Sequence, residues 1–554
     1  MNLRKGLAIT AAVLAAAAAL AYLNRLTLLQ YSLGWYNAVM FPRDDNRPVP
    51  WQAGPAQPAQ PVAQRPPNIV VILADDMGFN DVTTYGGGHG AQGVPTPHID
   101  ALARDGVRFD RGYAGSAVCT VSRAALMTGR YPWRFGVQFT PTPGAFAAVV
   151  GGLGSSDPHM PPAVIDRARA RKAKGFDDLG MPASEQTLAE LVKARGYHTV
   201  HIGKWHLGQS AEMRPNNQGF DESLNQEGLL YWPKNSPDVV NAMQDFDPID
   251  KFLWGNGRES VSFNGGKQFK PARYLTDYLT DEAVNAIQAN RHRPFLLYLA
   301  HWGVHSPLQA ARADYDALPH ITDHRRRVYA AMVRSVDRSV GRVTETLRAL
   351  GLEDNTIVVF TSDNGAPGYI GIPEVNKPFR GWKITLFEGG LRVPYVAKWP
   401  ARIPAGTQYA APVSNIDLLP TLVAAAGASL PTDRVVDGVN LLPHLAPGGP
   451  AQAERPLYWL DGHYRTVQDQ GWKLIVSQRP AKTWLFNLNT DPTERQNLAA
   501  SEPQRLALLR TMLDRHQAQM PPPLWEPFLE GPVFIDKTLD QPKAPGDEVT
   551  FWVN

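Results

Sequence analysis

The residues best suited to chemistry are a single cysteine, Cys119, and the arginine four positions after it, Arg123. The sequence after Cys119 is compatible with a helix, so the cysteine lies at or just before a helix N-terminus, where backbone N–H groups favour an anion. Arg123 is about one helical turn away, and its guanidinium can reach the same anion. Because cysteine is among the most often buried residue types, a buried thiol beside a surface arginine is the alternative interpretation.

Two acidic residues follow the first strongly apolar stretch of the chain. Residues 68–74 are apolar almost throughout, which predicts a central parallel strand buried on both faces, and Asp75 and Asp76 come directly after it. Adjacent carboxylates repel one another unless a cation or hydrogen bonds compensate. Open α/β sheets bind ligands at this edge, and carboxylate oxygens suit Ca²⁺ or Mg²⁺. A turn or a helix cap is the alternative for this pair.

A second oxygen-rich pair, Asp363 and Asn364, follows the apolar residues 356–360. An Asp-Asn-Gly sequence on its own is most often a turn. After a parallel strand, however, it brings its oxygens to the same sheet edge as Asp75 and Asp76.

Basic residues and histidines follow two other predicted strands. Lys204 and His206 are two positions apart, so on an extended segment both side chains point to one side, although such a pair is more often surface decoration. His301 and His305 come after the apolar residues 295–300. Either histidine can be a satisfied core residue; His305 is the better candidate for chemistry, with His301 in a supporting position.

The segment from Ser116 to Pro132 resembles the signature of the type I sulfatases, a Cys-x-Pro-Ser-Arg sequence followed by a Leu-Thr-Gly-Arg-Tyr-like run. Cys119, Ser122 and Arg123 match the signature, whereas Val121 stands where the family usually has proline or alanine. The Thr-Gly-Arg-Tyr part also matches.

Four further motifs occur in the family's order. The sequence at 203–208 is identical to the family's Gly-Lys-Trp-His-Leu-Gly, and His305 stands two residues before a proline, as in a His-x-Pro pattern. The resemblance covers roughly residues 68–500. Residues 304–309 and 484–488 look closest to the arylsulfatase B-like branch.

The resemblance implies a formylglycine-dependent enzyme of the alkaline phosphatase superfamily. In this family the signature cysteine is oxidised to formylglycine (3-oxoalanine) by a formylglycine-generating enzyme, and the hydrated aldehyde is the nucleophile. The implied metal is Ca²⁺, with Mg²⁺ as the alternative. Its implied protein ligands are Asp75, Asp76, the oxidised Cys119, Asp363 and Asn364.

The resemblance also assigns the basic residues. Lys204 would bind the sulfate, and His206 would act as a base on the covalent intermediate. His305 would contact the leaving-group oxygen, and Lys383 would touch the sulfate beside it. With Arg123 these residues form a cationic site, as a sulfate monoester requires.

The implied function is hydrolysis of sulfate monoesters of aryl alcohols or carbohydrates. One alternative is a phosphonate monoester or phosphodiester hydrolase of the same superfamily. The other is an exported, inactive protein that binds sulfated glycans, in which Val121 blocks maturation of Cys119.

The predicted fold class is α/β, with a large, mixed, mostly parallel sheet flanked by helices and a smaller C-terminal subdomain that contains a short antiparallel sheet. Helical spacing is predicted at 98–108, 185–195, 325–350 and 416–426. The expected divisions are a catalytic domain (68–430), a C-terminal subdomain (431–520), a tail (521–554) and an insertion over the site or solvated loop at 141–183. Aromatic residues in the 220–270 region, Phe220, Tyr231, Trp232 and Trp254, either line a sugar or aryl subsite or pack in the core.

The N-terminal segment, residues 1–42, predicts export. Arg4 and Lys5 precede an uncharged run from Gly6 to Leu23, near the lower limit for a membrane-spanning helix. An uncleaved anchor is favoured, with the catalytic domain in the periplasm or outside the cell; a small-x-small sequence at 19–21 permits a cleaved signal and a soluble product. Residues 43–67 read as a Pro-rich linker. A formal net charge of +3 implies no field for nucleic acid, and one cysteine excludes an intramolecular disulfide.

Overall fold

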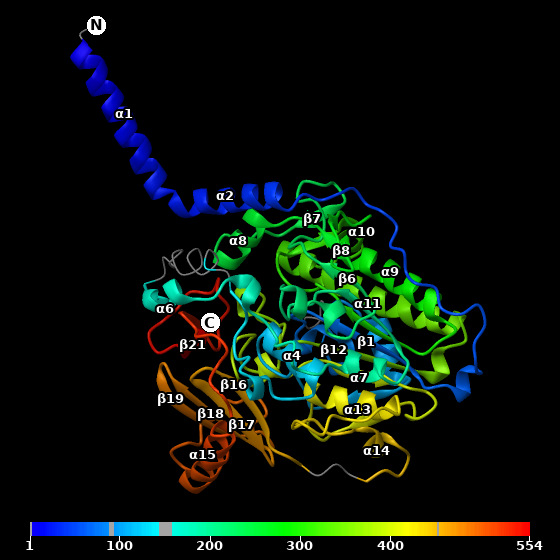
Figure 1. Cartoon of the computed structure of the whole chain (residues 1–554). Helices are drawn as coiled ribbons and strands as arrows, with labels where there is room; N and C mark the ends of the chain where they lie inside the picture. The colour runs from blue at the N-terminus through cyan, green and yellow to red at the C-terminus, as the bar shows by residue number, and fades with distance from the viewer. Residues whose placement is uncertain (1–2, 88–92, 143, 145–157, 451–453) are drawn as a thin grey trace.

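The computed structural model describes residues 3–87, 93–142, 144, 158–450 and 454–554, and its centre is a ten-stranded mixed sheet (Figure 1). In spatial order the strands are β14 (Thr407–Tyr409), β2 (Val107–Phe109), β13 (Tyr395–Lys398), β12 (Thr356–Ser362), β1 (Asn68–Ala74), β10 (Phe295–Ala300), β5 (His198–Gly203), β6 (Glu222–Gln226), β8 (Val261–Phe263) and β9 (Gln268–Phe269). Strands β12, β1, β10, β5 and β6 are parallel neighbours. The predicted fold class is therefore confirmed.

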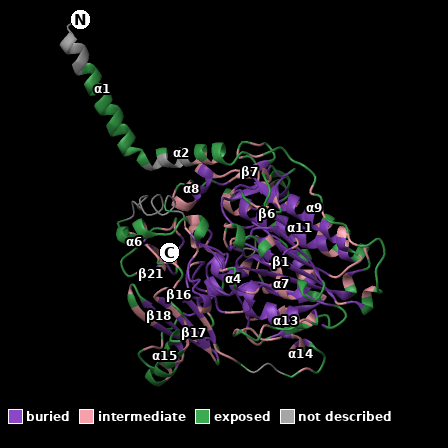
Figure 2. Ribbon diagram, viewed as in Figure 1, coloured by how far each residue is buried: buried purple, intermediate pink, exposed green. Residues whose placement is uncertain are grey.

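Strand β1 lies in the middle of the sheet and is buried along its whole length. Its side chains alternate between two hydrophobic clusters, with Val70 and Ile72 in one and Ile69, Val71 and Leu73 in the other. An apolar run without polar interruptions therefore reflects a strand that is covered on both faces (Figure 2).

Helices cover both faces of the sheet. On the Val70 face lie α3 (Pro97–Arg104), α9 (Leu275–Asn290) and α11 (His324–Ala349). On the other face lie α4 (Cys119–Thr128), α7 (Leu188–Lys193) and α13 (Leu418–Ala425). Further helices are α6 (Arg167–Lys172), α8 (Pro248–Asn256), α10 (Arg312–Asp316), α12 (Glu388–Leu391) and α14 (Leu442–Leu445).

Several predicted boundaries differ from the observed ones. The helix predicted at 98–108 ends at Arg104, because the chain enters β2 at Val107. The helix predicted at 185–195 begins only at Leu188, since the Thr187 hydroxyl accepts a hydrogen bond from the Glu190 N–H and caps the helix.

A four-stranded antiparallel sheet follows the catalytic region. It contains β16 (Leu457–Asp461), β17 (Tyr464–Asp469), β18 (Trp472–Gln478) and β19 (Ala481–Asn487). Helix α15 (Pro503–Gln517) packs on it through Leu509 and Leu513. This is the predicted short C-terminal sheet.

The segment after residue 520 is also folded. Strands β20 (Leu529–Phe534) and β21 (Val549–Val553) pair with each other, and β20 also pairs with β4 (Val164–Ile165). The tail therefore joins part of the 141–183 region in one three-stranded sheet. The remaining pairs of short strands are β3 (Gly112–Tyr113) with β15 (Val413–Ser414), and β7 (Val239–Asn241) with β11 (Gln309–Ala311).

The N-terminal helices lie outside this core. Helix α1 (Leu3–Leu23) points away from the rest of the chain, and α2 (Arg25–Met40) runs beside α8 (Figure 1). Within the described part of the chain, no helix combines the length and the apolar character required to cross a membrane. Residues 43–67 are mostly irregular and contact the body of the molecule, for example through Asp44, whose N–H donates to the Gln268 carbonyl.

Candidate functional site

The candidate site lies where the parallel strands end. Asp75 and Asp76 follow β1, Asp363 and Asn364 follow β12, and His305 lies in the loop after β10. All five are buried, and the backbone of Asp76 turns through a left-handed conformation with φ of 61°. The structure thus brings the predicted acidic residues to one edge of the sheet.

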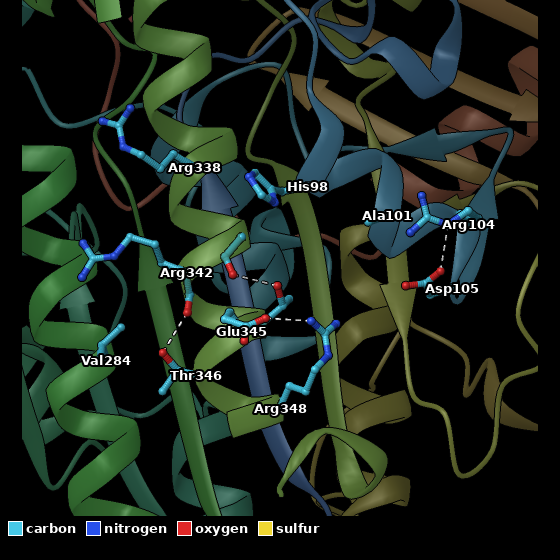
Figure 3. Close-up of a pocket in the computed structure, with 12 residues that line it drawn as sticks. His98, Ala101, Arg104, Asp105, Val284, Arg338, Arg342, Glu345, Thr346 and Arg348 are labelled. Carbon is cyan, nitrogen blue, oxygen red and sulfur yellow. Dashed lines mark hydrogen bonds and ion pairs between the residues drawn. The ribbon is translucent and has the colours of Figure 1, made fainter. Parts of the chain in front are cut away.

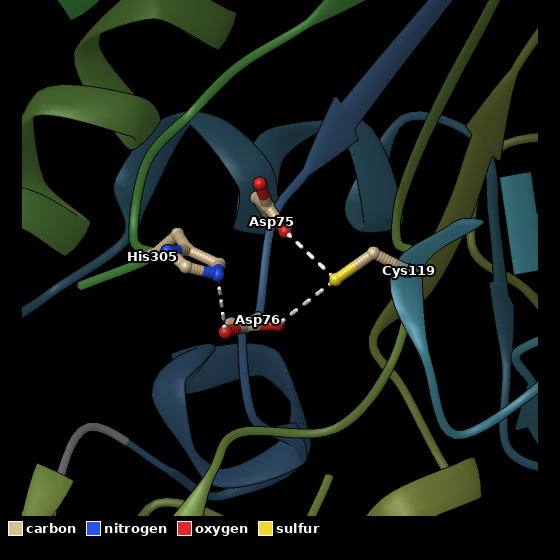
Figure 4. A group of neighbouring side chains, drawn as sticks. All are labelled: Asp75, Asp76, Cys119 and His305. Atoms are coloured by element: carbon tan, nitrogen blue, oxygen red, sulfur yellow. Dashed lines mark hydrogen bonds and ion pairs between the residues drawn. The ribbon is translucent and has the colours of Figure 1, made fainter. Parts of the chain in front are cut away.

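Cys119 is the first residue of α4 and faces the two aspartates (Figure 4). Its Sγ lies 3.6 Å from Asp75 Oδ1 and 3.8 Å from Asp76 Oδ1, and His305 Nε2 lies 3.5 Å from Asp76 Oδ2. One potential ligand atom from each of these four residues lies within 4.8 Å of the others. They form a compact group with the ligand types of a metal site.

Asp363 and Asn364 complete the acidic side of the site. Asp363 Oδ1 accepts a hydrogen bond from the Asp76 N–H at 3.2 Å, and its Oδ2 pairs with Arg123 Nε at 2.9 Å. Asn364 Nδ2 donates to Asp76 Oδ1 at 2.7 Å. Asn364 Oδ1 is buried and has no hydrogen-bond partner among the described residues. Such an orphaned oxygen, beside several carboxylates, fits a hard cation such as Ca²⁺ or Mg²⁺.

Three cations face these carboxylates. Lys204 Nζ lies 2.6 Å from Asp75 Oδ2, and Lys383 Nζ lies 2.7 Å from Asp76 Oδ1. Arg123 is fully buried and also donates from Nη1 to the Lys204 carbonyl at 2.8 Å. The basic residues predicted from separate motifs therefore meet at one place.

Burial and charge shift the titration of these groups in opposite directions. Burial raises the pKa of the Cys119 thiol far above its usual range, so the group is a neutral thiol at pH 7. Burial is the largest single influence on Asp75 and Asp76 and opposes their ionisation, but the surrounding positive charges, led by Lys204 at Asp75 and Lys383 at Asp76, together lower the pKa of each carboxyl. Burial lowers the pKa of His305 to about 4.

His206 follows Lys204 with its backbone in the left-handed region, at φ of 62°. The Thr120 hydroxyl, one residue after Cys119, donates to the His206 carbonyl at 3.0 Å. This bond ties the histidine loop to the start of α4. His206 Nδ1 is buried and lacks a hydrogen-bond partner in the described ranges.

Sequence reasoning missed two aromatic residues at the site, Tyr369 and Trp302, and it named a third, Tyr231, without placing it beside His305. Tyr369 OH lies 3.5 Å from Asp76 Oδ2. The ring of Trp302 stacks on His305 and lies 4.7 Å from Lys204 Nζ. Tyr231 OH donates within the His305 loop, 2.7 Å from the His305 carbonyl. Trp302 adjoins a recognised motif and could have been found, whereas nothing in the sequence singles out Tyr369.

The aromatic residues of the 220–270 region pack mainly in the interior. Phe220, Tyr231 and Trp254 are buried, and Trp232 is half-buried with its Nε1–H bonded to the Ser236 hydroxyl. Phe220 lies among His201, Trp205 and Tyr298. These contacts are those of core packing.

His301 and Arg392 behave as supporting residues. His301 is fully buried, and its Nε2 lies 2.8 Å from the Ser339 hydroxyl. Arg392 pairs with Glu388 at 2.9 Å, one helical turn away.

A surface hollow between α3 and α11 lies apart from this site (Figure 3). Its four arginines all have carboxylate partners, namely Arg104 with Asp105, Arg338 with Asp277 and Asp314, Arg342 with Asp281, and Arg348 with Glu345 and Glu353. The hollow therefore offers no unbalanced charge to a ligand.

Comparison with known proteins identifies the family of the chain and agrees with its fold. The family model described as Sulfatase matches residues 67–428, and the model described as N-sulphoglucosamine sulphohydrolase, C-terminal, matches residues 381–520. Human N-acetylgalactosamine-6-sulfatase is 35% identical over 409 residues, which cover 72% of this chain and 69% of that protein. Mouse steryl-sulfatase is 33% identical over 508 residues, which cover 79% and 74%.

A solved structure extends the comparison. The crystal structure of Ps i-CgsB in complex with k-i-k-neocarrahexaose superposes with a TM-score of 0.68 at 31% identity, and the match covers 83% of this chain and 95% of that one. A mixed sheet that gathers acidic, basic and cysteine side chains at one edge defines a hydrolase of the alkaline phosphatase superfamily. Within it, the chain belongs to the type I sulfatase family and is a sulfuric ester hydrolase.

Proposed function

We propose that the chain hydrolyses sulfate monoesters of carbohydrates or aryl alcohols with a formylglycine formed from Cys119 and a bound Ca²⁺ or Mg²⁺. The observation that carries the proposal is the position of Cys119 Sγ, 3.6 and 3.8 Å from the carboxylates of Asp75 and Asp76. The buried, neutral thiol is a poor nucleophile at pH 7, which favours a modified side chain at this position.

The proposal assigns one chemical role to the metal ion and one to the formylglycine. A divalent cation would be held by Asp75, Asp76, Asp363 and Asn364 beside residue 119, where it would supply Lewis-acid polarisation of a sulfate oxygen. The formylglycine hydrate supplies a hydroxyl nucleophile together with a second hydroxyl that allows sulfate to be released.

The chain's own residues then bind the sulfate and move protons. Arg123, Lys204 and Lys383 converge on the carboxylates beside Cys119 and balance the negative charge on the sulfate oxygens. His305 and Lys383 assist departure of the alcohol; because burial lowers the pKa of His305 to about 4, Lys383 is the charged member of this pair at pH 7. His206, anchored through Thr120, accepts a proton when the sulfate leaves.

The substrate class is best supported as sulfated carbohydrate. The human relative is named for N-acetylgalactosamine 6-sulfate, and the solved structure at 31% identity holds k-i-k-neocarrahexaose. The relatives named steryl-sulfatase support a sulfated sterol as a second substrate class. The narrower likeness to the arylsulfatase B-like branch stays a prediction.

Two measurements test the proposal. Mass spectrometry of the peptide that contains residue 119 is expected to show formylglycine in protein from the native host or made with a formylglycine-generating enzyme. The Cys119→Ala variant is expected to lose nitrophenyl sulfate turnover by more than about 1,000-fold.

The alternatives predict other outcomes. Turnover of nitrophenyl phosphonates far above nitrophenyl sulfate would favour the phosphonate monoester or phosphodiester hydrolase. An unmodified thiol and no turnover in the native host would favour the inactive protein that binds sulfated glycans.

We further propose that residues 1–42 direct export. The catalytic domain would then face the periplasm or the outside of the cell, tethered at the membrane, or free if the signal is cleaved. Its partners would be the sulfated substrate and the maturation enzyme, with no role for nucleic acid.

A further inference from the structure

The segment that carries Lys383, residues 376–391, is attached at several points to the C-terminal part of the chain. Before Lys383, Arg380 pairs with Asp536 at 2.6 Å and also with Glu548. Trp382 Nε1 donates to the Phe534 carbonyl at 3.1 Å. These contacts attach the first half of the segment to the tail, beyond the range that either family model matches.

The second half of the segment is attached to the four-stranded sheet. The Leu386 N–H donates to Tyr464 OH at 3.2 Å, and the Glu388 N–H donates to Glu494 Oε2 at 2.7 Å. Lys473 on β18 lies 2.9 Å from Glu388 Oε1 and 2.9 Å from Glu494 Oε1. The side chains of Lys473, Glu388 and Glu494 are all fully buried.

Lys473 is central to this attachment because it bridges two carboxylates that would otherwise repel each other. Arg392 supplies a second positive charge through Glu388. Burial raises the pKa of Glu494 to about 7, so its ionised form at neutral pH depends on the charge of Lys473 beside it. Removing one member of such a buried group leaves an uncompensated charge and favours rearrangement of its neighbours.

The backbone beside Lys383 shows why the segment needs external support. Ile384 has φ of 66°, in the left-handed region that β-branched residues avoid. A residue persists there only when its surroundings over-determine the conformation. The Lys383 N–H donates to the Ala366 carbonyl. The Ile384 N–H donates to the Ala117 carbonyl, which connects Ile384 with the segment leading to Cys119.

We propose that Lys473 is a positioning residue for the sulfatase reaction. It touches neither Cys119 nor the carboxylates of the site, and it acts by holding Glu388 and Glu494 so that Lys383 faces Asp76. The inference rests on the proposed role of Lys383 in binding sulfate. A C-terminal sheet that serves only stability is the competing explanation.

The first test compares Lys473→Met with Leu509→Ala. Leu509 is fully buried in the same subdomain, between α15 and the four-stranded sheet, and has no part in the charged group. Lys473→Met is expected to lower kcat/KM for nitrophenyl sulfate by about 100-fold, a typical result of misplacing a catalytic group by about 1 Å. Leu509→Ala is expected to lower Tm while kcat/KM stays within about twofold of wild type. Equal losses of kcat/KM in the two variants would overturn the proposal.

A double-mutant cycle asks whether the effect passes through Lys383. If Lys473 acts by positioning Lys383, adding Lys473→Met to Lys383→Ala costs no further activity. If the double variant instead loses activity by the product of the two single losses, the proposal is contradicted. Glu494→Gln, which removes one charge at constant size, serves if Lys473→Met does not fold, and it is expected to show the same dependence on Lys383.

A crystal structure of Lys473→Met or Glu494→Gln separates this proposal from the proposed function. Displacement of residues 380–388 away from Asp76 is expected whatever ester the enzyme cleaves. An unmoved segment would overturn the positioning role. Wild-type activity in Lys383→Ala would instead overturn the role assigned to Lys383 in catalysis.

Discussion

At the scale of single residues, Asn364 is well placed to test the proposed metal. Its Nδ2 already donates to Asp76, whereas its Oδ1 is buried without a partner among the described residues. Leaving a buried acceptor unpaired is costly, and a bound cation would remove that cost. The amide therefore reports on the metal independently of turnover.

The first prediction concerns stability in the presence of Ca²⁺. At a concentration 100 times Kd, Ca²⁺ is expected to stabilise the wild-type protein by about 2.7 kcal/mol, because the ion binds only the folded state. Asn364→Leu should reduce this gain, measured by thermal or denaturant unfolding with and without Ca²⁺.

Asn68→Leu is the matched control. Asn68 is also fully buried, and its Oδ1 has no partner in the part of the chain that the structure describes, but it lies at the opposite end of β1. The Asn68→Leu variant should be less stable than the wild type and should keep the full stabilisation by Ca²⁺. A Ca²⁺ gain that is unchanged in Asn364→Leu would rule out Asn364 as a ligand.

At the scale of elements, helix α15 connects the C-terminal sheet to the catalytic region through an aromatic cluster. The His516 ring stacks on Tyr458, and its Nε2 lies 3.0 Å from Trp133 Nε1. Because the indole nitrogen only donates, the histidine nitrogen must accept and is therefore unprotonated. Burial lowers the pKa of His516 to about 3.

The second prediction is a pH-dependent contribution of His516. In the unfolded chain the pKa of His516 is about 6.5. Between about pH 6.5 and 3, His516 is therefore protonated in the unfolded state and neutral in the folded state. The contribution of neutral His516 to the free energy of unfolding is complete above pH 6.5 and is lost as the pH falls toward 3. His516→Phe should show a smaller loss of unfolding free energy over this range than the wild type.

The exposed His320 provides the comparison. His320→Gln is expected to keep the wild-type slope of unfolding free energy against pH. If His516→Phe also keeps that slope, the Trp133–His516 hydrogen bond does not contribute as described.

How far the sequence predicts these elements depends on how local their causes are. The continuous apolar runs identified β1 and β10, and the oxygen-rich residues after β1 and β12 were correctly expected at one sheet edge. The start of α7 was misplaced although Thr187 and Glu190 carry a local capping pattern that marks it. Long-range pairing was not predictable: β20 joins β4 across more than 360 positions, and no local pattern announces it.

The site shows the same division. Asp75, Cys119 and Lys204 stand in recognisable motifs, whereas Lys473 belongs to none. Its role depends on Glu388 and Glu494, which are 85 and 21 positions away. Motifs identify the groups that face the substrate more readily than the groups that hold them.

At the scale of the whole molecule, the N-terminal helices differ from the rest of the chain. Ile9, Val13 and Leu20 each expose more than half of their surface, and α2 adds Trp35 at 69% exposed. Exposed apolar surface of this extent marks an interaction site. The segment that follows these helices is attached to the globular part by its own contacts, such as the ion pair between Arg43 and Glu259.

The third prediction is that residues 1–42 determine where the enzyme is found. The full chain is expected in the membrane fraction, released by detergent, or as a soluble exported form shortened at its N-terminus. The chain 43–554 should be soluble with unchanged kcat on nitrophenyl sulfate. Fractionation and N-terminal sequencing distinguish these results, and an unprocessed full chain in the cytosolic fraction would contradict the export proposal.

The single cysteine of this chain has a practical consequence. Each molecule carries at most one thiol, and in the folded protein burial shields it from reagents. After denaturation, a colorimetric thiol count per chain would therefore equal the share of molecules in which residue 119 was never converted. A preparation of this enzyme can report its own degree of maturation without digestion, labelling or an assay of turnover.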